Sequence, residues 1–255
     1  MMDCTIIIPV YNGQQYLKDA IDSAIIQGCD VVVVNDGSTD NTAIIMDYYK
    51  TKISQIHHHT NCGTASALNS GIKTAKTNWI RWLSADDVMY SGSLEKMMSM
   101  IQKYDNIENT IFYTHYDRMN GCKLSYFEEP DNSSNSKAVL LDHFYGNGST
   151  SLIHKNVFKK CGLFDEKIGY QEDYEFWLRC VLIYDVRLQL LDIKSIKYRI
   201  HDQQLTAQKH GEALHKSDDI RNAILDIVPQ YKNLLGTVHR PLKHRIKNRL
   251  RKIIY

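Results

Sequence analysis

The sequence lacks the features that would mark a disulfide-stabilised, zinc-finger or membrane-spanning protein. Its six cysteines form no C-x-x-C pair and no zinc-like spacing, which favours reduced thiols in a cytoplasm. No apolar run approaches the roughly 18 residues that cross a bilayer, and the N-terminus has no basic stretch followed by an apolar one. We therefore expect a soluble, cytoplasmic protein, with peripheral association with the inner face of a membrane left open.

A large excess of charge of either sign is also missing. The chain holds 31 Lys and Arg against 29 Asp and Glu, so nothing global indicates a nucleic-acid partner. What is present is a hydrophobic fraction of 43% over 255 residues. That amount is enough to bury the core of one principal domain.

The first hundred residues alternate short apolar runs with helical patterns, which is typical of βαβ units and a parallel sheet. Strands are expected at residues 4–9, 31–34, 53–58 and 79–83. A helix ending near Gly28 is predicted by the helical spacing of Leu17, Ala20, Ile21, Ala24 and Ile25, and a second helix is predicted near residues 64–75. The expected fold class is therefore α/β with a Rossmann-like, mostly parallel central sheet flanked by helices.

Residues 130–136 are the most loop-like stretch of the chain. We predict that they separate two halves, 1–115 and 137–228, of a single domain that covers residues 1–228. A long helical pattern around residues 172–184 falls in the second half. The remaining residues, 229–255, predict a basic amphipathic C-terminal helix, because the stretch from Arg240 onward has seven Lys and Arg, no acid and an apolar stripe.

Polar residues follow each of the first four predicted strands. Ligands of an open parallel sheet bind beyond the carboxyl ends of its strands, so these residues are expected to share one crevice. They are Tyr11-Asn12-Gly13, Asn35-Asp36-Gly37-Ser38, Asn61-Cys62-Gly63 and Asp86-Asp87. Each group alone is also a common turn or helix cap, and it is their joint placement that indicates a binding site.

Two adjacent carboxylates, Asp86 and Asp87, end the fourth predicted strand. Such a pair repels itself and is costly to bury unless a cation compensates it. Carboxylate oxygens suit Mn²⁺ or Mg²⁺, and such ions often bind the phosphates of a nucleotide as well. The competing interpretation is that Asp86 or Asp87 caps a helix beginning near Ser91.

Together these motifs resemble the family 2 glycosyltransferases, which have the GT-A fold. The resemblance rests on Pro9-Val10-Tyr11-Asn12-Gly13, Val34-Asn35-Asp36-Gly37-Ser38-Thr39-Asp40, Asn61-Cys62-Gly63, Ala67-Leu68-Asn69-Ser70-Gly71-Ile72 and Leu83-Ser84-Ala85-Asp86-Asp87. In the second half, Gly162-Leu163-Phe164-Asp165-Glu166, residues 172–179 and Tyr198-Arg199-Ile200-His201 are similar to the family's acceptor-side and late elements. The similarity covers roughly residues 3–206.

The resemblance implies a nucleotide-sugar donor, most simply a UDP-sugar, bound by residues 1–115, and an acceptor bound by residues 137–228. Tyr11 resembles the aromatic residue that stacks on the base, and Asp36 the acid that bonds the base or its ribose. The full set of implied donor contacts is Pro9, Tyr11, Asn12, Asp36, Asn61, Gly63, Asn69, Ser84, Ala85 and Arg199. Ser84 stands where the family's D-x-D motif has its first acid, and Leu68 where the family often has Arg.

The same resemblance implies the metal ligands and the catalytic acids. Asp86 and Asp87 match the metal-binding end of the D-x-D motif, and His201 is the implied third ligand for Mn²⁺ or Mg²⁺. Asp173 matches the catalytic base of an inverting transfer, and Glu172 is expected to orient it. From the residues alone, Glu172, Asp173 and Glu175 are better explained as first-turn acids favoured by the helix dipole. Residues 57–59, three consecutive histidines, are interpreted as a structural strand end, because successive strand side chains point to opposite faces.

The resulting hypothesis is an inverting, metal-dependent glycosyltransferase acting on a glycan or lipid-linked acceptor, with no nucleic-acid partner. The basic tail suggests contact with anionic lipid, although a tail packed on the domain or in an oligomer explains it equally. A non-catalytic nucleotide-sugar-binding protein is the alternative, prompted by Ser84 and Leu68. A nucleotidyltransferase fits less well, because residues 10–15 contain no basic side chain for a phosphate loop. The sugar, the acceptor and the oligomeric state cannot be read from the sequence.

Overall fold

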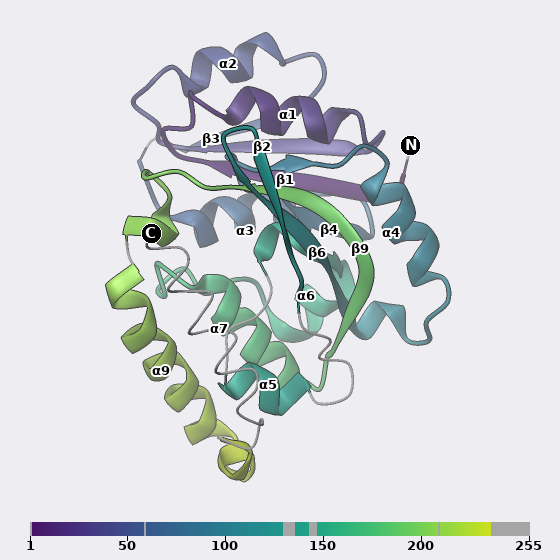
Figure 1. Ribbon diagram of the computed structural model, residues 1–255, viewed down its shortest axis with the longest axis vertical. Helices are drawn as coiled ribbons and strands as arrows, with labels where there is room; N and C mark the ends of the chain where they lie inside the picture. The colour runs from purple at the N-terminus through teal and green to yellow at the C-terminus, as the bar shows by residue number, and fades with distance from the viewer. Residues whose placement is uncertain (1, 59, 130–135, 143–146, 209, 236–255) are drawn as a thin grey trace.

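The computed structural model of the chain describes residues 2–58, 60–129, 136–142, 147–208 and 210–235 (Figure 1). The predicted tail from residue 236 onward and nearly all of the predicted loop at 130–136 lie outside these ranges. The strands are β1 (Cys4–Val10), β2 (Asp30–Asp36), β3 (Ser54–His58), β4 (Trp79–Trp82), β5 (Val88–Met89), β6 (Thr110–Asn120), β7 (Lys123–Phe127), β8 (Leu152–His154) and β9 (Arg187–Arg199).

The helices of the first half are α1 (Leu17–Ile25), α2 (Thr42–Tyr48), α3 (Thr64–Thr74) and α4 (Ser93–Ile101), with a short 3₁₀ helix η1 (Ile107–Asn109). Two of them, α1 and α3, lie where the sequence predicted them, and α2 and α4 were not predicted. The second half contains α5 (Ser136–Asp142), η2 (Gly148–Thr150), α6 (Lys155–Cys161), α7 (Glu172–Leu178), η3 (Arg179–Ile183), α8 (Leu205–Gln208), α9 (His210–Ile227) and η4 (Pro229–Leu234). Within the described ranges no helix combines the length and hydropathy that a membrane span requires.

The four predicted strands pair in parallel in the order β3-β2-β1-β4. Their side chains alternate between two cores, because successive residues of a strand face opposite sides of the sheet. Ile6 and Ile8 of β1 pack in the cluster built with α1, α2 and α4, whereas Ile7 packs in the cluster built with α3 and α7. Figure 1 shows α1 and α2 above these strands and α3 below them. Both faces are therefore covered, as the continuous apolar runs predict.

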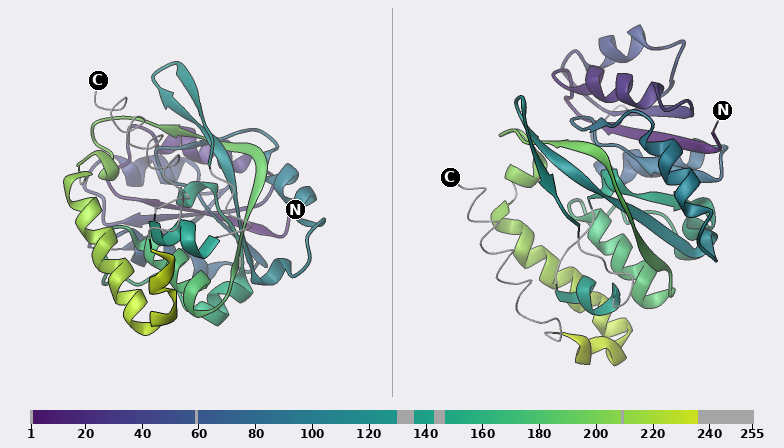
Figure 2. Two further views of the ribbon diagram at one scale, coloured as in Figure 1. Left: turned by 60° about the horizontal axis from the view of Figure 1, so that its bottom comes forward. Right: turned by 45° about the vertical axis from the view of Figure 1, so that its right-hand side comes forward.

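The second half extends the same sheet rather than building another. β8 runs antiparallel to β4 and to β6, and β9 continues the sheet by pairing in parallel with β6. β5 and β7 add antiparallel pairs to β9 and β6. Figure 2 shows β6, β7 and β9 curling away from the plane of the N-terminal strands. Residues far apart in the sequence thus meet beside β4, which leads into the predicted acid pair.

The helical pattern predicted at residues 172–184 forms two segments. α7 ends at Leu178, and residues Arg179–Ile183 continue as a π-helix. At this junction the Arg179 guanidinium makes a two-point ion pair with Glu175 and donates to the carbonyl oxygens of Cys161 and Leu163. The junction is therefore fixed against the segment that follows α6.

Candidate functional site

The loops after β1 and β2 are joined by hydrogen bonds at the carboxyl edge of the sheet. The Asn12 N–H donates to Ser38 Oγ at 2.9 Å, and Asn12 Oδ1 accepts from the Thr39 N–H at 2.8 Å. Asn12 has a φ of 51°, a conformation that asparagine tolerates better than most residues. Beside this junction the Tyr11 ring remains 49% exposed. An exposed aromatic ring on a fixed loop is available to stack on a planar ligand.

Asp36, at the end of β2, is buried and organises the loop after β3. Its carboxylate accepts the N–H groups of Cys62 at 3.1 Å and Gly63 at 2.7 Å. The ring of His58 lies 2.7 Å from the same carboxylate through Nδ1, and its Nε2 lies 2.9 Å from Ser70 Oγ. The loop itself presents Asn61 at the surface, with Asn61 Oδ1 accepting from the Gly63 N–H. The structure thus brings together Tyr11, Asn12, Asp36, Asn61 and Gly63, as predicted.

Asp86 meets His201 across 115 positions of the chain. The distance from Asp86 Oδ2 to His201 Nε2 is 3.0 Å, and both side chains keep some exposure. Asp86 follows β4, and His201 follows β9. A carboxylate and an imidazole that face each other at this spacing are a pair of potential ligands for one cation.

Arg199 fixes the chain beside this pair. Its backbone N–H donates to Asp87 Oδ1 at 3.0 Å, and its side-chain Nε donates to the carbonyl oxygen of Asp86 at 2.8 Å. The outer guanidinium nitrogen pairs with Asp19 at 2.9 Å. Because Arg199 contacts both acidic residues through different groups, it holds the end of β9 against the end of β4.

Two residues of this region were not predicted from the sequence. The ring of Tyr16 lies 4.6 Å from the ring of His201 and 4.6 Å from the guanidinium carbon of Arg199. Asp19, one turn into α1, makes the ion pair with Arg199. The only signal in the sequence is their place at the start of the first helix, and that gives no hint of a partner 180 residues away.

Asp87 differs sharply from Asp86. It is fully buried, and within the described part of the chain its Oδ2 atom has no hydrogen-bond partner. Burial, and next the charge of Asp86, raise the pKa of Asp87 well above its usual range. Neither acid caps a helix: α4 begins at Ser93 with Gly92 at its N-cap. The helix-cap interpretation of the acid pair is therefore wrong.

Ser84 stands where an acid was expected from the D-x-D motif, and its hydroxyl is already hydrogen-bonded. Its Oγ accepts from Ser149 Oγ at 3.0 Å, and its N–H donates to the same Ser149 Oγ at 3.0 Å. Ala85, next to it, and Pro9, in β1, are both partly buried. These three predicted donor contacts lie on or beside neighbouring strands, but the Ser84 hydroxyl is committed to the turn that carries Ser149.

The second predicted acid pair, Glu172 and Asp173, opens α7. Glu172 is buried, whereas Asp173 reaches the surface in part. Most of the Asp173 carboxyl nevertheless lies among protein atoms, so desolvation, and next the charge of Glu172, raise its pKa well above the usual range. The preceding residue, Gln171, has a φ of 66° and is held by Ser217 Oγ at 3.0 Å. The entry to α7 is therefore fixed by α9.

Thr206, in α8, lies close to two tyrosines that are each near one acid pair. Burial and the nearby charges of Asp87 and Asp86 raise the pKa of Tyr198 to about 12. Burial and the charges of Asp173 and Glu172 raise the pKa of Tyr170. The segment around Thr206 therefore lies near both acid pairs, which the sequence did not reveal.

Asn69 lies apart from the other predicted donor contacts. It is buried in α3, and its amide nitrogen donates to the carbonyl oxygen of Phe164 and to Glu166, both at 2.9 Å. Its Oδ1 accepts from the Phe164 N–H at 3.0 Å. In this structure the side chain joins the two halves of the chain.

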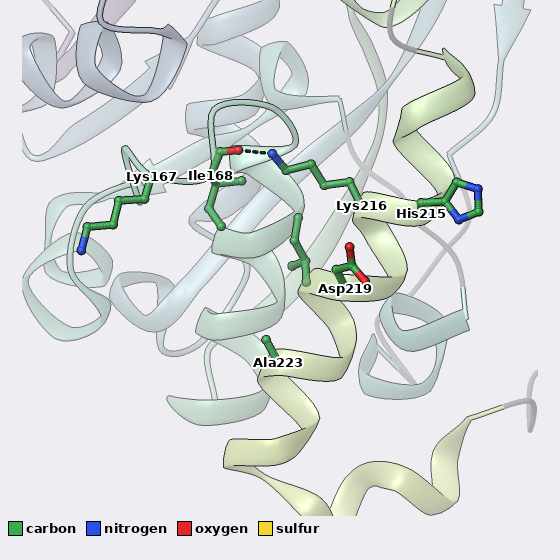
Figure 3. A pocket seen from close by; sticks show the side chains of 7 residues that line it. Lys167, Ile168, His215, Lys216, Asp219 and Ala223 are labelled. Atoms are coloured by element: carbon green, nitrogen blue, oxygen red, sulfur yellow. Dashed lines mark hydrogen bonds between the residues drawn. The ribbon is translucent and has the colours of Figure 1, made fainter.

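A hollow of about 620 Å³ lies between α9 and the segment that leads to α7 (Figure 3). Lys216 donates to the carbonyl oxygen of Ile168 across it. Lys167 and His215 extend in opposite directions from the hollow, which leaves Ile168, Ile220 and Ala223 along its apolar side. Its position beside the entry to α7 makes it a candidate for contact with an acceptor.

Comparison with known proteins agrees with this geometry. The family model described as glycosyl transferase family 2 matches residues 5–162. An uncharacterised glycosyltransferase from Rickettsia typhi is 38% identical over 211 residues, and one from Rickettsia prowazekii is 37% identical. Each alignment covers 79% of this chain, and the chain spans only 65% of the length of either relative.

Solved structures match the fold at low sequence identity. A fragment of TarS from S. aureus, solved with UDP-GlcNAc, has a TM-score of 0.68 at 18% identity, covering 94% of this chain and 74% of that one. GalNAc-T7, solved with UDP, GalNAc and Mn²⁺, has a TM-score of 0.60 at 13% identity, covering 78% and 44%. The α/β architecture, with its curled sheet and flanking helices, is thus that of GT-A-like glycosyltransferases.

The family model spans more than half of the chain, including the loops after β1, β2 and β3 and the acid pair after β4. The contacts found in those loops agree with the motifs on which the sequence resemblance rests. The chain accordingly belongs to glycosyl transferase family 2.

Proposed function

We propose that the protein is an inverting glycosyltransferase that moves a sugar from a nucleotide-sugar donor, most simply a UDP-sugar, to a hydroxyl of a glycan or lipid-linked acceptor. The observation that carries the proposal is the meeting of Asp86 and His201, with their donor and acceptor atoms 3.0 Å apart. They lie at the same edge of the sheet at which the loops after β1, β2 and β3 begin. Glu172 and Asp173 lie near Tyr170, which is close to Thr206 in the segment that follows His201.

The donor would bind at the joined loops of the first half. Tyr11 would stack on the base, and the loops that carry Asn12, Asp36, Asn61 and Gly63 would enclose the base and ribose. The UDP and UDP-GlcNAc complexes of TarS support this class of donor, since that fragment shares the fold. Arg199 would contribute positive charge near the diphosphate.

A divalent cation fits the pair formed by Asp86 and His201. Asp86 Oδ2 and His201 Nε2, which lie 3.0 Å apart, would hold the ion, since carboxylate oxygen and imidazole nitrogen are both ligands of divalent cations. A mixed oxygen and nitrogen set suits Mn²⁺ better than Mg²⁺, which prefers oxygen alone. When bound, such an ion would neutralise charge that develops on the departing diphosphate. Asp87, which has no exposed surface, would serve by holding the Arg199 backbone rather than by facing the ion.

Asp173 would act as the general base that removes a proton from the acceptor hydroxyl. A carboxylate whose pKa lies well above its usual range is a stronger base than an ordinary aspartate. Glu172, buried beside it, would set both its orientation and its pKa. The acceptor itself would approach from the side of the hollow near Ile168, which borders the same loop.

The proposal is tested by a thermal-shift screen of nucleotide sugars with and without Mn²⁺, followed by transfer and donor-hydrolysis assays with the best donor. A bound donor stabilises the folded state by mass action, so one nucleotide should raise the melting temperature more than the others. Metal-dependent turnover of that donor is the expected result. Donor binding with no turnover under any metal would leave the binding-only alternative, which the hydroxyl of Ser84 in place of an acid prompts.

Membrane contact by the C-terminal tail is a separate part of the proposal, based on sequence. Seven basic residues and an apolar stripe after Arg240 would attract anionic lipid, each basic residue contributing about 1 kcal/mol near the surface. The full chain should float with anionic liposomes, and a chain ending at Val238 should not. Equally poor flotation of the two would exclude this role for the tail.

A further inference from the structure

A second group of potential metal ligands lies at the ends of β2 and β3 and in the loop that follows β3, among residues that no sequence spacing connected. Asp36, His58 and Cys62 each offer one ligand atom, and these atoms all lie within 4.8 Å of one another. Asp36 is buried, His58 is partly buried and Cys62 is exposed. Among the described residues this is the one cluster of three such side chains.

We propose that Asp36, His58 and Cys62 form a binding site for a thiophilic divalent cation of the Zn²⁺ class. One carboxylate oxygen, one imidazole nitrogen and one thiolate sulfur are a donor set that zinc favours over Mn²⁺ or Mg²⁺. Three protein ligands leave a fourth tetrahedral position for water. The exposed Cys62 gives the ion a path from solvent.

The ligands are already oriented by partners of their own. His58 Nε2 lies 2.9 Å from Ser70 Oγ, which directs Nδ1 toward Asp36, and a ligating histidine generally uses its second nitrogen in this way. Asp36 is held by the N–H groups of Cys62 and Gly63. Cys62 Sγ, in contrast, has only weak contacts with Thr60, at 3.5 Å and 3.7 Å. The thiol is therefore the ligand most free to turn toward an ion.

Close packing limits how far this loop can move. A side chain on Gly37 would come within 2.6 Å of the backbone of Thr60 and 2.7 Å of that of Asn61. Gly37 also has a φ of 76°, which favours glycine. The turn after β2 thus presses directly on the loop that carries Cys62, which lowers the entropy cost of assembling the three ligands.

The balance of protons and charge at the three ligands also fits a divalent cation. On binding, the Cys62 Sγ–H bond breaks, a sulfur–metal bond forms and the proton goes to solvent. The proton that a neutral His58 shares with Asp36 through Nδ1 moves to Nε2, where it is donated to Ser70 Oγ. A thiolate, a carboxylate and a neutral imidazole together carry two negative charges, which one divalent cation neutralises.

Occupation of this site would interfere with the donor, a consequence that rests on the proposed function. Asp36 and the loop at Asn61 and Gly63 are the proposed contacts of the base. An ion bound there would occupy the Asp36 carboxylate, which could then no longer accept a hydrogen bond from the base. It would also hold the loop at Asn61 and Gly63 in place. The enzyme would then be activated by a hard cation at Asp86 and His201, and inhibited by a soft cation at Cys62.

Cobalt(II) titration of the full chain under reducing conditions tests the site without using activity. Thiolate ligation to Co²⁺ produces an intense near-ultraviolet charge-transfer absorption, which should saturate at one equivalent and disappear on addition of Zn²⁺. Cys62→Ser should abolish the absorption, whereas Cys122→Ser, which removes another exposed thiol, should retain it. His58→Gln removes a ligand and should weaken Co²⁺ binding by more than the roughly 10–100-fold that loss of a residue supporting a ligand typically costs. Absent absorption in the wild type, or equal absorption in Cys62→Ser, would refute the site.

Uridine separates this inference from the proposed function, because it carries a base and no phosphate to chelate the metal. Uridine should raise the melting temperature of the metal-free protein and should weaken Co²⁺ binding in proportion to its concentration. Stabilisation by uridine without competition would refute the inhibition and leave the donor site standing. Co²⁺ binding through Cys62 with no stabilisation by uridine would count against the proposed base site and leave the metal site standing.

Discussion

The two acid pairs of the molecule that were predicted as functional, Asp86 with Asp87 and Glu172 with Asp173, look alike in sequence and differ in environment. In the first pair the partly exposed acid faces His201, and the buried acid has the raised pKa. In the second pair the partly exposed acid itself has the raised pKa. Pairs whose environments separate their proton affinities are typical of divided roles. The difference supports the proposal that the first pair holds a cation and the second accepts a proton.

Loss of the proposed base, Asp173, should have the largest effect on the transfer rate. Asp173→Asn should lower the transfer rate about 10²–10⁴-fold, the usual contribution of a general base, and leave donor-induced stabilisation unchanged. Steady-state transfer assays and thermal shifts with donor measure the two quantities. In the wild type, the rate should fall as pH decreases through the raised pKa of Asp173, since the base must be ionised. Full activity of Asp173→Asn would exclude the role.

Substitution within the first pair should distinguish Asp86 from Asp87. Asp86→Asn should reduce metal-dependent transfer by about 100-fold or more, because a cation ligand supporting the leaving group is lost. Asp87→Asn keeps an oxygen to accept the Arg199 N–H and should retain most of the activity. Manganese titrations of the transfer rate compare the two. Equal losses in both variants would mean that the buried acid also faces the ion.

Tyr16 offers a smaller test of how the cation pair is positioned. Tyr16→Leu removes the ring that contacts His201 and Arg199, and should weaken the apparent affinity for Mn²⁺ about 10-fold while changing kcat little. Tyr16→Phe keeps the ring and serves as the matched control, with an affinity close to that of the wild type. If both variants lose affinity equally, the ring contacts are not what positions His201.

The smallest expected effect is on stability. A buried acid with a raised pKa destabilises the folded state as pH rises above about 3.9, the ordinary value for Asp, up to the raised pKa. Asp87→Asn should therefore have a higher melting temperature than the wild type at neutral pH, by about 2–4 °C for each kcal/mol. The gain should vanish near pH 3. A variant that is less stable at neutral pH would show that Asp87 is stabilised as a charged group.

Local patterns predicted much of the first half. Continuous β-branched and aliphatic runs predicted β1 to β4, and the polar residues that follow them do meet at one edge of the sheet. Asp86 and His201 were both named as metal ligands, but His201 only through the family resemblance, because nothing in the residues near 201 indicates that they approach Asp86. Tyr16, Asp19 and Thr206 went unrecognised for the same reason, since a single polar residue at a helix start has many explanations.

The sequence by itself determined the α/β pattern, the family and the residue types at each strand end, because these depend on periodicity and local order. Only the tertiary structure decided which acid is buried, which is partly exposed and which side chains meet. Burial of Asp87 and the approach of His201 to Asp86 arise from pairing between β5 and β9, whose members are about a hundred residues apart. Desolvation and charge proximity act through space, so the chemistry of each acid follows from packing that no short stretch of sequence contains.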